Sequence, residues 1–188
     1  MNTKDSHSGT LAELAKAGMR FGIPDPHAIR PNQKEIPDFL KHLPTYGNYP
    51  VPFVQIWIDG KPDFRITDFE NIMRCVYEKL CAICGKGLPE EVWFIGGEKV
   101  LEYHLFTDPA MHKECAEYVS RTCPYVNGER RSFSEREVKC PHHTSQLVDS
   151  ETQRMLLLRT DRDATRMVRL RGEILIQAGQ WKEVIDIT

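Results

Sequence analysis

Four potential metal ligands stand in two closely spaced pairs near the middle of this chain. Cys81 and Cys84 are separated by two residues, and His112 and Cys115 have the same spacing. Thiolates and imidazoles are the ligands of zinc in tetrahedral structural sites, and a set of four leaves no coordination position for a substrate. The pattern therefore predicts one structural Zn²⁺ bound by Cys81, Cys84, His112 and Cys115.

The residues after the first pair predict a knuckle and then a β-hairpin. Gly85 and Gly87 allow the positive φ angles that a tight knuckle needs. Apolar and aromatic residues at 91–95 and 100–106 flank a pair of glycines at 96–97. Two such runs around a glycine pair are typical of a hairpin.

The second pair of ligands falls where a helix is expected to begin. Asp108 is a good N-cap, and Pro109 suits the first helical position because no amide hydrogen is needed there. His112 and Cys115 would then share one face of the first turns. Knuckle, hairpin and helix in this order predict a treble-clef zinc module.

The other cysteines have less specific surroundings. Cys75 falls on the apolar stripe of an expected helix that starts near residue 69, so we expect it to be a small core residue. A second metal site is one interpretation of the ligand-like residues further on, and a polar turn with incidental histidines is the other; these residues are Cys123, Cys140, His142 and His143. Disulfides are not expected, because the polar start of the chain lacks a secretory signal.

Composition limits the classes of function. The net charge is −2 with 28% charged residues, which argues against a dedicated, strongly basic nucleic-acid binder. No apolar run approaches the length of a membrane-spanning helix. We therefore expect a cytoplasmic protein, and 188 residues are enough for one or two domains with a real core.

The chain divides into three expected segments within an α+β fold. Residues 1–48 hold a short helix, opened by a capping box at 10–13, and a proline-rich arm. Residues 49–126 form the zinc-binding core, with a strand pair at 53–66 and a helix at 69–79 before the knuckle. Residues 127–188 are expected to be a β-rich segment packed on that core. Its strands would form an antiparallel β-meander, at 155–159, 166–170, 173–176 and 181–187.

Three segments carry specific motifs: YPVPF at 49–53 with DGKPDFR at 59–65, LCAICG at 80–85, and HKECAEY at 112–118 with CPY at 123–125. Together they resemble an uncharacterised family of small zinc-binding proteins from bacteria and their phages. The resemblance covers about residues 49–126 and implies the same four zinc ligands and a bacterial cell or phage-infected host. It also implies that Cys123 belongs to the pattern, without giving its role.

Basic residues are concentrated in one part of the chain. Residues 121–171 hold eleven basic and seven acidic side chains. This excess could contact phosphate or an acidic protein surface, although interleaved aspartates and the lack of alternating aromatics also fit an ordinary solvated face. The candidate nucleic-acid contacts are Arg130, Arg131, Arg162, Arg166, Arg169 and Arg171.

Two enzymatic interpretations have weaker support. An HNH-type nuclease needs a histidine base beside a divalent metal, and His104 is the candidate, but it lacks the neighbouring aspartate and helix asparagine of that motif. A zinc hydrolase with Glu114 as base would need an open metal position, which four ligands do not leave. The sequence therefore favours a non-catalytic, zinc-stabilised binding protein that acts on a macromolecular partner, such as a host-defence complex or a regulator.

Overall fold

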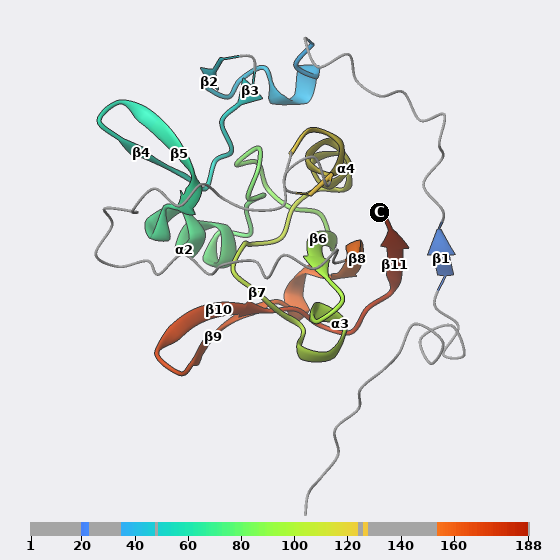
Figure 1. Ribbon diagram of the computed structural model, residues 1–188. Coiled ribbons are helices and arrows are strands. Elements are labelled where there is room, and N and C mark those ends of the chain that lie inside the picture. Colours follow the sequence, from blue (N-terminus) through green and yellow to red (C-terminus); the bar gives the residue numbers. More distant parts are fainter. Residues whose placement is uncertain (1–19, 23–34, 48, 124–125, 128–153, 188) are drawn as a thin grey trace, which may run out of the picture.

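The computed structural model describes residues 20–22, 35–47, 49–123, 126–127 and 154–187 (Figure 1). This part of the chain is a mixed α+β structure, in which the sheets are antiparallel except where β1 joins β11. The helical elements are η1 (Asp38–Leu40), α2 (Phe69–Tyr77), α3 (Val100–Tyr103), α4 (Lys113–Thr122) and η2 (Arg162–Ala164). None of the helices in these ranges is long and apolar enough to cross a membrane.

A four-stranded sheet in the order β1-β11-β8-β6 forms the centre of the molecule. Its strands are β1 (Arg20–Gly22), β6 (Glu91–Gly97), β8 (Met155–Asp161) and β11 (Glu183–Asp186). Side chains alternate across a strand, so one face of this sheet gathers five residues that are at most 1% exposed: Val92, Phe94, Leu156, Leu158 and Val184. Because β6 and β8 pair along their whole length, the expected core and the expected C-terminal segment share this sheet.

The hairpin predicted across 91–106 is wrong. β6 pairs with β8, whereas 100–106 folds into α3 and the short strand β7 (Leu105–Phe106). Neither glycine of the 96–97 pair has a positive φ angle, so the pair does not turn the chain. A Cβ at Gly96 would lie 2.8 Å from a Val100 methyl carbon and 3.1 Å from the Phe106 ring. The glycine therefore allows α3 and β7 to pack closely against the end of β6.

All four C-terminal strands form where they were predicted, but the predicted meander is wrong. β9 (Arg166–Leu170) and β10 (Glu173–Gln177) pair with each other, and β10 continues to β7, while β8 pairs with β11. The β9–β10 hairpin is thus an arm inserted between two paired strands, and it projects from the body in Figure 1. The Thr160 hydroxyl donates to the Gln180 carbonyl at 2.8 Å and ties the two connections of this arm together.

The strand pair and helix that precede the knuckle match the prediction. β4 (Gln55–Ile58) and β5 (Lys61–Thr67) form a hairpin, and the short strands β2 (Thr45–Tyr46) and β3 (Tyr49–Pro50) pair beside it. The Asp68 carboxylate accepts from the Asn71 amide at 3.1 Å and caps α2. Cys75 is 3% exposed on this helix, which confirms its place in the core, and burial raises its pKa to about 12. The short helix expected to begin at the capping box at 10–13 lies outside the described residues.

Candidate metal centre

The four predicted ligands converge in space. The Sγ atoms of Cys81, Cys84 and Cys115 and a ring nitrogen of His112 all lie within 4.8 Å of one another. The three thiols are buried, and the imidazole is half-buried at the edge of the group. The two pairs, which are 28 positions apart in sequence, thus form one compact donor set of three sulfurs and one nitrogen. This set could bind one metal ion.

A tight turn presents the first two sulfurs. The Gly85 amide donates to the Cys81 carbonyl at 2.9 Å, and the Cys81 amide donates to the Lys86 carbonyl at 2.8 Å. Gly85 has the predicted positive φ, +69°, whereas Gly87 does not have a positive φ. A Cβ at Gly85 would lie 2.8 Å from the Phe53 ring. Only glycine meets both conditions without strain, so this residue fixes the path of the chain after Cys84.

Backbone hydrogen bonds hold the knuckle from two sides. On one side, the Phe53 amide donates to the Ile83 carbonyl at 2.9 Å and the Val54 amide donates to the Ala82 carbonyl at 3.1 Å. On the other, the Ala82 amide donates to the Ala110 carbonyl at 3.0 Å. The loop is therefore positioned by the chain just before β4 and by the segment that leads into α4.

The helix that carries the second pair of ligands begins later than predicted. α4 starts at Lys113, with His112 in the N-cap position, rather than at Asp108 and Pro109. The reason is that Met111 pairs with Trp93 through two backbone hydrogen bonds of 2.9 Å, which keeps the preceding chain extended. His112 and Cys115 nevertheless reach the same side of the first turn, and the Trp93–Met111 bridge connects the cluster to the central sheet.

Hydrogen bonding fixes the tautomer of the imidazole. Nε2 of His112 lies 3.0 Å from the Gly87 carbonyl oxygen, and Nδ1 lies 3.3 Å from the Cys84 sulfur. A carbonyl only accepts, so the proton is on Nε2 and the lone pair of Nδ1 faces the thiols. A carbonyl that orients a ligating histidine in this way is typical of metal sites.

The thiols of the cluster differ in acidity. Burial opposes ionisation of Cys81, but hydrogen bonds from the Cys115 and Cys84 thiols and from the amides of Cys84 and His112 lower its pKa to about 3. The hydrogen bonds that Cys115 gives to Cys81 and Cys84, together with burial, raise the pKa of Cys115. The protein alone thus stabilises negative charge at Cys81, and a divalent cation at this point would favour thiolates at all three cysteines.

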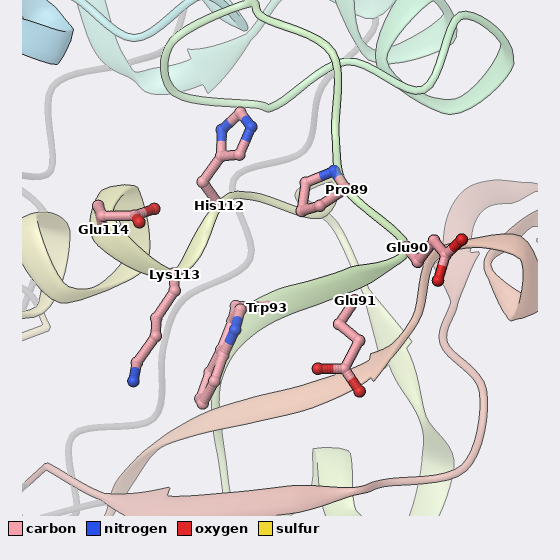
Figure 2. Close-up of a pocket in the computed structure, with 7 residues that line it drawn as sticks. All are labelled: Pro89, Glu90, Glu91, Trp93, His112, Lys113 and Glu114. Atoms are coloured by element: carbon pink, nitrogen blue, oxygen red, sulfur yellow. The ribbon is translucent and has the colours of Figure 1, made fainter.

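A shallow hollow of about 620 Å³ lies beside the imidazole (Figure 2). Figure 2 shows the His112 ring directed toward the knuckle loop, while Lys113 extends alongside Trp93, with its ammonium 5.6 Å from the ring centroid. Glu114 is exposed and is not a member of the ligand group. The hollow is open and mixed in character, and its lining is Pro89, Glu90, Glu91, Trp93, His112, Lys113 and Glu114.

His104, the candidate nuclease base, has a structural place. It ends α3 in the left-handed conformation, with φ 54°. Its ring stacks on Trp181 at 4.5 Å between centroids and 11° between planes, and Nδ1 donates to the Gly179 carbonyl at 2.8 Å. In the part of the chain that the structure describes, no group of metal ligands other than the Cys₃His cluster is found.

The four candidate nucleic-acid contacts that the structure describes do not share one face. Arg162 binds Asp163 and donates to the Leu88 carbonyl at 3.0 Å, so it connects η2 to the loop before β6. Arg166 and Arg169 stand three positions apart on β9 and therefore point to opposite faces of the β9–β10 hairpin. Arg171 is exposed at the turn of that hairpin, and Arg130 and Arg131 lie outside the described residues.

Of the four residues considered for a second metal site, the structure describes Cys123 alone. Cys123 follows the last residue of α4 as a half-buried free thiol. The rest of the second site considered from the sequence lies outside the residues that the structure describes, at Cys140, His142 and His143.

One hydrogen bond to the knuckle could not be predicted from the sequence. Nε2 of His42 donates to the Cys84 carbonyl at 2.8 Å, across 42 positions. His42 follows η1 in a stretch without a ligand motif, so no local pattern indicates it. The carbonyl of Gly87, which orients His112, is equally invisible to motif reasoning because any residue supplies a carbonyl.

Comparison of the chain with family models, with curated proteins and with solved structures finds no match. The geometry of the Cys₃His cluster is therefore the principal guide to its chemistry.

Proposed function

We propose that Cys81, Cys84, His112 and Cys115 bind one Zn²⁺ as a structural ion. Three sulfurs and one imidazole nitrogen suit tetrahedral zinc in number and kind, and the carbonyl of Gly87 holds the imidazole in the ligating tautomer. When bound, the ion would cross-link the knuckle to the start of α4. The knuckle and this helix would then be the two ligand-bearing parts of a treble-clef-like module, in which β6 stands where a treble clef has its hairpin.

The same observation argues against catalysis at this centre. Four protein ligands fill a tetrahedral zinc, so no position remains for an activated water. His104 stacks on Trp181, and no group of metal ligands in the described part of the chain includes it, so the divalent metal that a nuclease base needs has no visible site there. The function that the closed ligand set supports best is that of a rigid, non-catalytic module.

The exposed apolar side chains of the chain suit a macromolecular partner. Of the ten large apolar side chains that are exposed in the described part, seven fall between residues 46 and 77. Tyr46 and Tyr49 are 45% and 41% exposed on the β2–β3 pair, and the Tyr46 ring contacts Phe64 at 6.5 Å between centroids. Exposed aromatic residues in contact with each other, such as Tyr46 and Phe64, are typical of protein-binding surfaces.

The proposed function is therefore that of a zinc-stabilised binding protein of bacterial or phage origin, whose partner is a protein complex of the host or of its own cell. A host-defence complex or a transcription regulator fits this class. The resemblance of residues 49–126 to the bacterial and phage family supports the origin. Nucleic acid is the alternative partner, through Arg169 and Arg171 on the β9–β10 arm.

Two measurements test this proposal. Elemental analysis of the purified chain should find about one zinc per molecule, and none or a fraction of one would contradict the metal assignment. Affinity capture from nuclease-treated bacterial lysate should recover a stoichiometric complex that is lost in the Tyr46→Ser, Tyr49→Ser double variant. The matched control is Arg169→Ala with Arg171→Ala, which should leave this complex unchanged. Failure of the wild-type chain to recover a complex, together with a salt-sensitive gel shift that the arginine variant loses, would instead support the nucleic-acid alternative.

A further inference from the structure

The β4–β5 hairpin is a separate two-stranded sheet, and neither strand pairs with another strand in the described part of the chain. It projects from the body beside α2 (Figure 1). Trp57 and Phe64 are each 44% exposed on it, and Ile58 is 40% exposed. A free two-stranded sheet with exposed apolar side chains is a template for pairing with another chain.

The two edges of this hairpin differ in chemistry. β5 begins with Lys61, Pro62 and Asp63, and charges and proline are the devices that keep an edge strand from pairing. β4 reads Gln-Ile-Trp-Ile over Gln55–Ile58, without a charge or a proline. The β4 edge is therefore the one that remains competent to add a strand.

The register shows which backbone groups face outward on β4. Asp59 and Gly60 form a two-residue turn with positive φ angles, so the pair that closes it, Ile58 with Lys61, is hydrogen-bonded. Hydrogen-bonded and open pairs alternate in an antiparallel ladder, so Trp57 opposite Pro62 is an open pair. Proline fits there because no amide hydrogen is needed. The N–H and C=O of Trp57 consequently point away from β5, and no described residue pairs with them.

We propose that β4 pairs with β4 of a second copy of this chain, antiparallel and about a two-fold axis at Trp57. The axis places the outward N–H of each Trp57 opposite the outward C=O of the other, which gives two reciprocal hydrogen bonds. It also places the two indole rings side by side as a cross-strand aromatic pair. No like charges meet, because the strand has none.

The second copy is favoured over a foreign peptide by this self-complementarity. The backbone N–H of Gln55 already donates to the Pro52 carbonyl at 3.0 Å. The hydrogen-bond ladder between the two copies therefore extends little beyond Trp57. An unrelated strand would gain the same two hydrogen bonds without the matching indole. An isologous contact is also closed, so it stops at a dimer and leaves the protected β5 edges outside. This dimer goes beyond the proposed function and does not depend on the zinc or on Tyr46 and Tyr49.

Sedimentation equilibrium of the zinc-loaded full chain tests the dimer. The wild-type chain should show a concentration-dependent monomer–dimer equilibrium. Trp57→Pro removes the outward amide hydrogen without removing a hydrogen bond of the hairpin, and it should raise the dissociation constant at least about tenfold, or 1.4 kcal/mol. Tyr77→Lys changes an exposed aromatic at the end of α2, 69% exposed, and should leave the equilibrium unchanged. A wild-type monomer at all concentrations, or equal weakening by Tyr77→Lys, would overturn the proposal.

Cysteine cross-linking tests the register and does not rely on a proline variant. In the proposed dimer residue 57 faces residue 57 of the other copy at a Cα separation of about 5.5 Å, which a disulfide can span. Trp57→Cys should therefore form a covalent dimer with oxidised glutathione. Ile58→Cys, which would face residue 56, should stay monomeric in a denaturing gel, as should the wild-type chain. Faster cross-linking of Ile58→Cys than of Trp57→Cys would overturn this register.

Discussion

The metal-ligand cluster and the central sheet are held together by different means. The sheet gains its stability from large apolar side chains on β6, β8 and β11, such as Phe94 and Leu158, which are almost fully buried. The buried groups of the cluster are three thiols on a loop and a helix start, positioned by backbone hydrogen bonds. The sheet can exclude water by itself, whereas in the proposed function a bound ion would hold the donors of the cluster together. They meet at the Trp93–Met111 bridge.

Loss of a ligand should have the largest effect. Cys84→Ser is expected to lose the metal and the cooperative thermal transition, because structural zinc contributes on the order of 10 kcal/mol to folding. Elemental analysis and thermal melting by circular dichroism would measure both. Cys123→Ser, which changes a half-buried thiol outside the cluster, should keep the zinc and the transition. Unchanged melting of Cys84→Ser would show that the apolar sheet alone holds the fold.

A cavity in the sheet should cost less and leave the metal in place. Leu158 is 0% exposed, and Leu158→Ala should lower the free energy of unfolding by about 2–5 kcal/mol, through lost burial and the cavity left behind. The folded variant should still hold about one zinc per chain. Denaturant unfolding would give the difference, with Leu170→Ala as the control, since Leu170 is 48% exposed on β9. Loss of zinc in folded Leu158→Ala would show that the two regions are not separable.

The contrast between these regions also explains how far the sequence could predict the structure. The grouping of the four candidate ligands could be predicted because the spacing in each pair, Cys81 with Cys84 and His112 with Cys115, is a local property. The knuckle followed from Gly85 for the same reason. The four C-terminal strands and α2 were also predicted, since alternation and a capping aspartate are visible in short windows.

Strand partners were not predictable in this way, because pairing depends on residues distant in sequence. Nothing near β6 shows that its partner is β8, more than fifty positions further on. The glycines at 96–97 favoured a turn, although Gly96 serves close packing against Val100 and Phe106. The start of α4 was misplaced for a related reason, since the bridge between Met111 and Trp93 keeps the chain extended past Pro109.

Alkaline pH should lower the stability of the fold through the buried thiol of Cys75. Burial raises the pKa of Cys75 to about 12, while the unfolded thiol ionises near 9.0. Between these values the unfolded state loses its proton first, so stability is fully present below pH 9 and falls as the pH rises toward 12. The slope from this group is about 1.4 kcal/mol per pH unit, so the loss near pH 10 should be about 1.4 kcal/mol.

The pH dependence of Cys75→Ala isolates this contribution. The variant is less stable at neutral pH because it loses a buried sulfur, but its free energy of unfolding should fall less steeply above pH 9 than that of the wild-type chain. Denaturant unfolding at several pH values would measure both slopes. Identical slopes would mean that the Cys75 thiol ionises as easily in the folded chain as in the unfolded one.

The smallest expected effect concerns the contact that supports the cluster from outside. His42 donates from Nε2 to the Cys84 carbonyl, so His42→Ala removes one hydrogen bond and no metal ligand. The free energy of unfolding should fall by about 0.5–1.5 kcal/mol, with zinc content unchanged and release of the ion to a chelator accelerated. His42→Gln keeps an N–H donor on a side chain of similar reach and should recover part of this loss. If both variants release zinc at the wild-type rate, the knuckle is held by its own turn and by the strands around it, and His42 contributes only to the surface.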